Sequence, residues 1–192
     1  MSKLELIVLG FINRDNIYGY EIVKFFKDTG FYEWMKIKLP SIYKVLSRLE
    51  KKELIEKKRV YQDDGIPKNE FSITQKGKEE FPIAMKNYLT NQEDAHFFEF
   101  IFFTLLIKQS VTRKTFLKAL QIHIDKIKDT SEEKKAKHDA LRAFFPEETF
   151  ISPLIGNHFK TIKEQYLSFF ENMKEKAMLP ENDSYFMQEE HQ

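Results

Sequence analysis

The spacing of apolar residues predicts that the chain begins with two helices. Ser2 and Glu5 have the spacing of a capping box, in which each side chain bonds to the other residue's backbone. The apolar positions that follow share one face of a helix, and they are Leu4, Ile7, Val8 and Phe11. A second helix is predicted from about Tyr18 to Asp28, and Gly30 lies where a helix stop is expected.

A third helix is predicted to begin at Pro40 and Ser41, because proline is favoured in the first turn of a helix. Its apolar stripe consists of Ile42, Val45, Leu46 and Leu49. The opposite face carries donors, acceptors and cations, namely Ser41, Tyr43, Lys44, Ser47, Arg48 and Lys51. A helix that is buried on one side and polar on the other is typical of a recognition helix in the major groove of DNA.

The pattern then changes to that of a β-hairpin. A strand is predicted from Leu54 to Tyr61, followed by a turn rich in Asp, Gly and Pro and by a second strand in which Phe71 and Ile73 alternate with polar residues. Thr74 can cap a further helix that runs to about Leu89. Three helices, a hairpin and a helix form the order of a winged helix-turn-helix domain.

The second half of the chain is rich in phenylalanine, with 13 of the 19 Phe residues between positions 91 and 192. The segment from Phe97 to Ile107 is apolar on every side of a helix, so we expect a partner chain to help cover it. Another helix is predicted from about Thr112. Further on, apolar residues recur at coiled-coil spacing, and they are Ile155, Phe159, Ile162, Tyr166, Phe169 and Met173. We expect a homodimer whose interface contains these six residues together with Phe98 and Phe102.

The predicted fold class is therefore mainly α-helical with a small β-hairpin. Residues 1–90 are predicted to form a winged helix-turn-helix domain, residues 91–180 a helical dimerisation domain, and residues 181–192 a flexible tail. A cavity between the subunits, lined by Phe, Trp34 and Tyr side chains and able to bind a small aromatic or hydrophobic effector, is a further hypothesis.

Charge is separated along the chain although the total is only +1. Residues 1–90 contain 17 basic and 13 acidic residues, whereas the window from Lys36 to Arg59 contains nine basic and three acidic ones. This window, at +6, covers the predicted recognition helix and the first hairpin strand. Local positive charge of this kind favours a nucleic-acid partner.

Composition excludes several other classes of protein. The chain has no cysteine, which removes disulfide frameworks and thiolate-ligated metals. Glu5 interrupts the position of a signal-peptide core, and the apolar run from Phe97 to Ile107 is shorter than the roughly 20 residues of a membrane span. The five histidines form no repeated carboxylate–histidine set, and no catalytic motif is present. We expect a cytoplasmic protein that is not an enzyme, with no metal, no cofactor and no membrane partner.

Four ordered stretches within residues 4 to about 80 resemble the signature of PadR-like transcriptional regulators. They are Ile7–Gly10, Tyr18–Ile22, Leu39–Glu50 and Phe71–Gly77. The resemblance implies a winged-helix homodimer that acts mostly as a repressor and that, in many members, responds to small aromatic or cationic compounds. The longer helical second half is similar in architecture to the subfamily whose C-terminal helices form the dimer.

The resemblance also assigns roles by position. The family's DNA-facing tyrosine corresponds to Tyr43, and its wing lysine corresponds to Lys68. Two positions depart from the family pattern: Glu53 replaces the glycine before the first wing strand, and the wing lacks the arginine usually found between proline and lysine. The resemblance therefore leaves the wing contacts open.

The sequence predicts a sequence-specific DNA-binding regulator, a repressor that binds a pseudo-palindromic stretch of double-stranded DNA as a homodimer. The alternative is a winged-helix protein–protein interaction module, in which the basic face binds an acidic partner instead of DNA.

Overall fold

The computed structural model describes residues 1–61, 67–90, 97–129 and 151–188. They are mostly helical, with one small sheet, and they divide into two units. Unit 1 contains residues 1–112 together with the chain from Ser184 onward, and unit 2 spans Arg113–Asp183. This division differs from the predicted boundary after residue 90.

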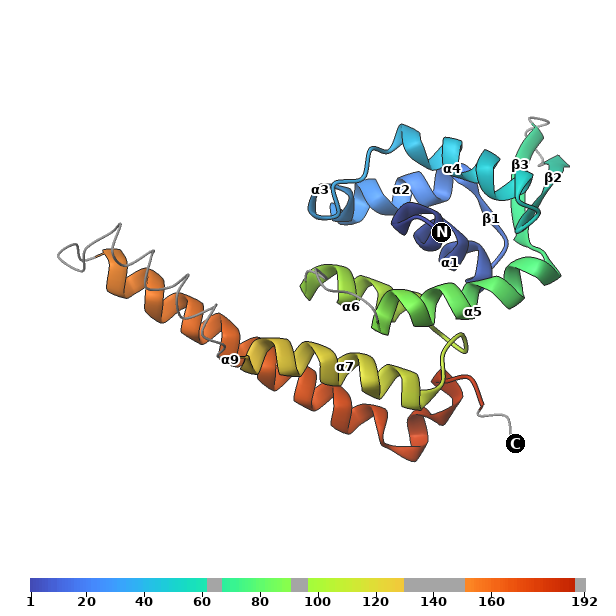
Figure 1. Ribbon diagram of the computed structural model, residues 1–192. Coiled ribbons are helices and arrows are strands. Elements are labelled where there is room, and N and C mark those ends of the chain that lie inside the picture. Colours follow the sequence, from blue (N-terminus) through green and yellow to red (C-terminus); the bar gives the residue numbers. More distant parts are fainter. Residues whose placement is uncertain (62–66, 91–96, 130–150, 189–192) are drawn as a thin grey trace. The chain divides into compact units, whose positions relative to one another are not determined.

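Unit 1 contains the predicted winged-helix elements in their expected order, together with β1 and α3, which were not predicted. They are α1 (Lys3–Arg14), β1 (Ile17–Tyr18), α2 (Gly19–Thr29), α3 (Phe31–Trp34), α4 (Pro40–Lys51), β2 (Ile55–Tyr61), β3 (Pro67–Ile73), α5 (Gln75–Thr90) and α6 (Phe97–Leu106) (Figure 1). The predicted helix signals are present: Ser2 and Glu5 form the capping box, and Gly30 ends α2 with a left-handed φ of 69°. Thr74 accepts a hydrogen bond from the backbone N–H of Gly77 at 3.0 Å, which caps α5.

Helix α1 lies at the centre of unit 1, with α2 and α4 on one side and α5 and α6 on the other (Figure 1). It contacts α4, α5, α6 and β3. Every residue from Glu5 to Gly10 is buried, as is Ile12. The spacing of apolar residues predicted a single buried face for α1, but the helix is covered around its whole circumference.

The three strands form one antiparallel sheet in the order β1-β3-β2. In the hairpin Ile55 pairs with Ile73 and Arg59 pairs with Asn69. Strand β1 was not predicted from the sequence, because two residues are too few to show an alternating pattern. It pairs Ile17 with Phe71 and so joins the end of α1 to the wing.

Helix α6 is buried largely by its own chain. Phe102 packs against the rings of Phe11, Phe25, Phe26 and Phe31, with ring centroids 5.2–6.3 Å apart. Phe100, Phe103 and Leu106 are also buried in the single chain, whereas Leu105 is half-exposed. Most described residues of α6, including Phe102, therefore need no partner chain to cover them, contrary to the expectation from the sequence. The side chain of Phe98 lies outside the described residues.

The chain after unit 2 packs against unit 1 instead of forming the flexible tail that was predicted from residue 181. The backbone N–H of Gln109 donates to Tyr185 at 2.8 Å, and the N–H of Met187 donates to Val111 at 2.9 Å. The hydroxyl of Tyr185 bonds to the carbonyl oxygen of Thr104. Phe186 is buried, so an apolar anchor accompanies these hydrogen bonds through residue 187.

Unit 2 pairs α7 (Arg113–Lys128) with α9 (Ile151–Ala177), and the two helices run in opposite directions (Figure 1). A 3₁₀ helix, η1 (Pro180–Tyr185), follows α9. His123 of α7 is buried and stacks on Phe170 of α9, with ring centroids 5.4 Å apart. Burial, together with the charge of Lys126, lowers the pKa of His123 to about 4, so this histidine is neutral at pH 7.

A buried carboxylate connects α1 to the C-terminal end of α4. The side chain of Glu5 accepts a hydrogen bond from Lys52 Nζ at 2.9 Å, and Arg48 Nε lies 3.8 Å from the same oxygen. Burial alone would raise the pKa of Glu5, but the hydrogen bond and charge of Lys52 and the hydrogen bonds from Ser2 outweigh burial. The pKa of Glu5 falls to about 2, so the carboxylate stays charged at neutral pH.

Substitution Gly77→Ala is expected to lower the free energy of unfolding by more than about 2 kcal/mol. A Cβ atom at this position would overlap the carbonyl oxygen of Leu54 and lie 2.7 Å from the side chain of Ile73. Thermal unfolding followed by circular dichroism measures the effect. Lys78→Ala, at the exposed neighbouring position, is the control and should change stability by less than about 0.5 kcal/mol. Equal melting temperatures for the two variants would contradict this account.

Substitution Glu5→Gln is expected to lower the free energy of unfolding by about 1–3 kcal/mol at pH 7, because it removes a charged hydrogen bond while glutamine can still complete the capping box. The unfolded carboxyl takes up a proton near pH 4.5, whereas the folded one does so near pH 2. The stabilisation by Glu5 is therefore complete above pH 4.5 and disappears as the pH falls towards 2.

Urea unfolding at pH 7, 5 and 3 tests this dependence. The difference between wild type and Glu5→Gln should shrink at the lowest pH, while the control Glu80→Gln, at an exposed position, should match wild type throughout. A difference that stays constant between pH 7 and pH 3 would mean that the charge of Glu5 is not its source.

Candidate nucleic-acid interface

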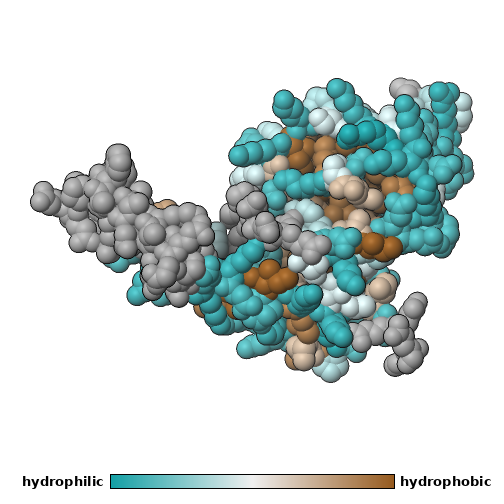
Figure 2. All heavy atoms as spheres, in the orientation of Figure 1, coloured by the Kyte–Doolittle hydropathy of each residue, from teal (hydrophilic) through white to brown (hydrophobic). Residues whose placement is uncertain are grey.

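Helix α4 has the two faces that the sequence predicted. The stripe of Ile42, Val45, Leu46 and Leu49 is buried in unit 1. The side chains of Lys44, Ser47, Arg48 and Lys51 are exposed, Tyr43 is 51% exposed, and Ser41 is half-buried. The surface over α4 and the neighbouring hairpin is mostly hydrophilic in Figure 2. A polar ridge of this kind can enter the major groove of DNA without uncovering the core.

The first residue of α2 sets how closely α4 packs. A Cβ atom at Gly19 would lie 2.9 Å from Leu46 and 3.2 Å from the ring of Tyr43. A larger residue would require the side chain of Leu46 or the ring of Tyr43 to shift, so glycine allows this close approach. The ring of Tyr43 is thereby held at the edge of the exposed face of α4.

The nine basic residues between Lys36 and Arg59 divide into two groups. Three of them are paired with carboxylates: Arg48 and Lys52 with Glu5, and Lys57 with Glu50 at 3.1 Å. The others have no ion pair or side-chain hydrogen bond among the described residues, and they are Lys36, Lys38, Lys44, Lys51, Lys58 and Arg59. These six cations are available to an external anion.

Arg48 differs from the other predicted contacts, because it belongs to the paired group. Its Nε atom faces Glu5, yet 56% of its side chain is exposed. Since five N–H donors are present on a guanidinium, pairing at Nε leaves the terminal nitrogens with donors to offer. The sequence did not reveal this pairing, because Glu5 and Arg48 are far apart in the chain.

The remaining predicted DNA contact, Lys68, lies on β3 and is half-buried. Its cross-strand neighbour is Val60 of β2. It is therefore less accessible than Lys44 or Lys51.

The predicted dimer residues of α9 are accessible to different extents in the single chain. Phe159 is 64% exposed and Phe169 is 38% exposed, whereas Ile162, Tyr166 and Met173 are half-buried. The side chain of Ile155 lies outside the described residues. A contiguous patch of exposed apolar side chains is one kind of surface at which a partner binds, and Phe159 and Phe169 are candidates for such a patch.

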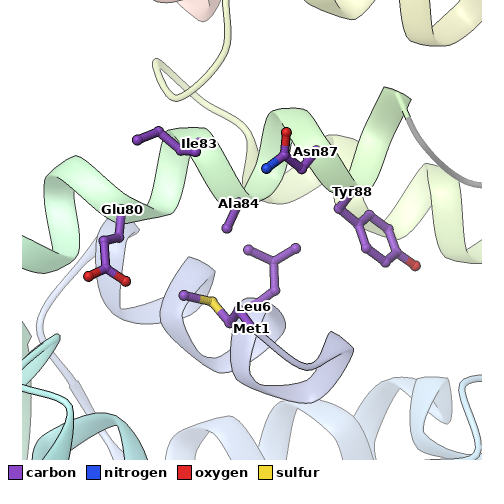
Figure 3. A pocket seen from close by; sticks show the side chains of 7 residues that line it. All are labelled: Met1, Leu6, Glu80, Ile83, Ala84, Asn87 and Tyr88. Carbon is purple, nitrogen blue, oxygen red and sulfur yellow. The ribbon is translucent and has the colours of Figure 1, made fainter.

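Other kinds of site are less well supported. A shallow pocket of about 320 Å³ lies between α1 and α5, and its lining consists of Met1, Leu6, Glu80, Ile83, Ala84, Asn87 and Tyr88 (Figure 3). This lining holds no histidine, serine or cysteine.

Among the described residues no group of three or more His, Asp or Glu side chains could hold a metal ion. Within the same part of the chain, no helix is long and apolar enough to cross a membrane.

Comparisons with known proteins agree with the winged-helix geometry. Residues 8–82 match the family model of the transcriptional regulator PadR-like family. No curated protein matches the chain.

Solved structures include similar proteins. A Streptococcus transcriptional regulator is 29% identical over 44% of this chain and 80% of its own, with a TM-score of 0.38. Bacillus subtilis PadR in complex with operator DNA is 20% identical over 91% of this chain and 98% of its own, with a TM-score of 0.39. The same protein in complex with p-coumaric acid is 19% identical over 91% and 95%, with a TM-score of 0.35. Residues 8–82, which contain the winged helix, are therefore similar to the transcriptional regulator PadR-like family.

Proposed function

We propose that this transcriptional regulator binds double-stranded DNA by placing α4 in the major groove. The observation that carries the proposal is the set of six unpaired cations on and around α4 and the hairpin, beside a face of α4 that has no buried apolar residue. Cations that are already paired with carboxylates gain little from a phosphate, whereas an unpaired cation displaces a condensed counterion from the DNA when it binds.

The exposed residues of α4 have two roles in binding DNA, contacts to phosphates and contacts to bases. Lys44 and Lys51 contact phosphates and so fix the position of the helix on the duplex. Ser47 and Tyr43 bond to bases or backbone, and Arg48, oriented by Glu5, uses its terminal nitrogens for a guanine edge. Among these residues Arg48 carries sequence information most directly, because a bidentate contact distinguishes guanine from the other bases.

Homodimerisation through α9 completes the proposed function. The exposed rings of Phe159 and Phe169 support an apolar interface between two copies of this helix. A two-fold dimer presents two α4 helices to half-sites about 10–10.5 bp apart, or a multiple of that spacing. Binding at a promoter then represses transcription by occlusion, in the cytoplasm where DNA is accessible.

An effector of small aromatic or hydrophobic character would relieve repression by favouring a dimer with a different helix spacing. B. subtilis PadR, which has been solved with p-coumaric acid, is the precedent for such a ligand. For this chain the effector stays a prediction from the sequence.

Substitution Lys44→Ala is expected to weaken DNA binding by about 5–10-fold at 0.15 M salt and to lower the slope of log affinity against log salt by about 0.9. The DNA is a fragment selected from the source genome by the purified protein. Fluorescence anisotropy over a series of salt concentrations gives both quantities. The control is Lys114→Ala, an exposed lysine of unit 2, which should bind like wild type. Wild-type binding that is independent of salt would refute the DNA proposal and favour the protein-interaction module.

Substitution Phe159→Glu is expected to convert the dimer to a monomer, because it places a charge in an apolar interface. Size-exclusion chromatography with light scattering measures the mass. The control is Ser168→Glu, which adds the same charge at an exposed position on another side of α9 and should leave the dimer intact. A stable dimer of the Phe159→Glu variant would show that the interface lies elsewhere.

A further inference from the structure

The two faces of the β2–β3 hairpin carry different residues. Successive residues of a strand point to opposite faces of the sheet, and residues that pair across the strands share a face. One face holds the pairs Ile55–Ile73, Lys57–Phe71, Arg59–Asn69 and Tyr61–Pro67. The other face holds the pairs Glu56–Ser72, Lys58–Glu70 and Val60–Lys68.

Two contacts identify the first of these as the face on the side of α4. The ring of Phe71 lies 3.6 Å from the position of a Cβ atom at Gly19, which is also the point where Tyr43 of α4 approaches. Lys57 donates to Glu50 of α4. Because Phe71 and Lys57 are paired across the strands, both contacts concern the same face.

Along this face the core gives way to exposed residues towards the tip of the hairpin. Phe71 is buried, but Arg59 and Asn69, the next pair on the same face, are exposed. Tyr61 follows and is 71% exposed. Arg59 has no hydrogen bond or ion pair among the described residues, so its guanidinium is available on the side of the recognition helix.

The opposite face is less suited to an anion. Lys58 lies directly across from the carboxylate of Glu70, which reduces the local positive potential. Lys68 is half-buried beside Val60. The cation that the family pattern places on this face therefore has the weaker position in this chain.

We propose that Arg59, with Tyr61 beside it, is the residue by which the wing of this protein binds DNA, and that it enters the minor groove next to the site of α4. The inference rests on the proposed DNA-binding function and extends it to specificity. Arginine is attracted to minor grooves that are narrow, which occur in A·T-rich sequence. Arg59 thus selects A·T-rich flanks outside the bases that α4 reads.

The test compares Arg59→Gln with Lys58→Gln, adjacent exposed cations on opposite faces of one strand. Full-length proteins are titrated with the genomic fragment selected by wild type and with a copy in which the A·T pairs of the flanks are replaced by G·C. Circular dichroism melting first establishes that both variants fold like wild type, as expected for exposed positions.

We expect Arg59→Gln to weaken binding to the selected fragment by about 10-fold and to bind the two fragments almost equally. Lys58→Gln removes at most one phosphate contact, so it should weaken binding to both fragments alike, by less than about 3-fold, and keep the wild-type preference for A·T flanks. Equal losses for the two variants, or a flank preference that survives in Arg59→Gln, would overturn the role of Arg59. Wild-type protein that selects no DNA at all would instead overturn the proposed function, so the two failures are distinguishable.

Discussion

The arrangement of unit 1 depends on one requirement, which is that α1 must be covered on all sides. Leu6, Ile7, Val8, Leu9 and Ile12 are all buried. One neighbouring helix cannot cover an apolar surface that surrounds a cylinder, so α4, α5, α6 and β3 each contact α1. The burial of several large aliphatic side chains, each worth about 1.5–3 kcal/mol, makes this helix a substantial source of stability in the unit.

The same requirement shapes the surface that faces DNA. Glu5 is the charged residue in the buried part of α1, and its carboxylate must be compensated. Arg48 of α4 and Lys52, the residue that follows the helix, provide the compensation, so the buried carboxylate engages the ammonium of Lys52 and the Nε of Arg48 before any DNA is bound. Ion pairing within the protein therefore decides, as much as the number of basic residues does, which cations can bind DNA.

Local signals in the sequence were sufficient for most of the fold. The capping box at Ser2, the stripe on α4 and the alternation around Phe71 depend on neighbours only a few residues away, and each predicted its element. The candidate face of α4 was predicted for the same reason, since burial of one stripe determines which side chains point outward.

Features that depend on distant residues could not be predicted in this way. The pairing of Arg48 with Glu5 and the short strand β1 arise from tertiary contacts with no local pattern. Helix α6 illustrates the difference well: its apolar circumference was evident, but hydrophobicity does not specify whether the cover comes from α1 and the aromatic cluster around Phe102 or from another chain. The hairpin register, which separates Arg59 from Lys58, likewise needs the pairing with β3.

The return of the chain to unit 1 after Asp183 has a consequence for the order of events during synthesis. The residues that pair with Gln109 and Val111 are Tyr185 and Met187, and all of unit 2 lies between them in the sequence. A ribosome therefore releases the winged helix well before the segment that completes it. Until Phe186 emerges, the surface around Thr104 and Val111 is left without its final cover, so unit 1 can complete its folding only after unit 2 has been synthesised.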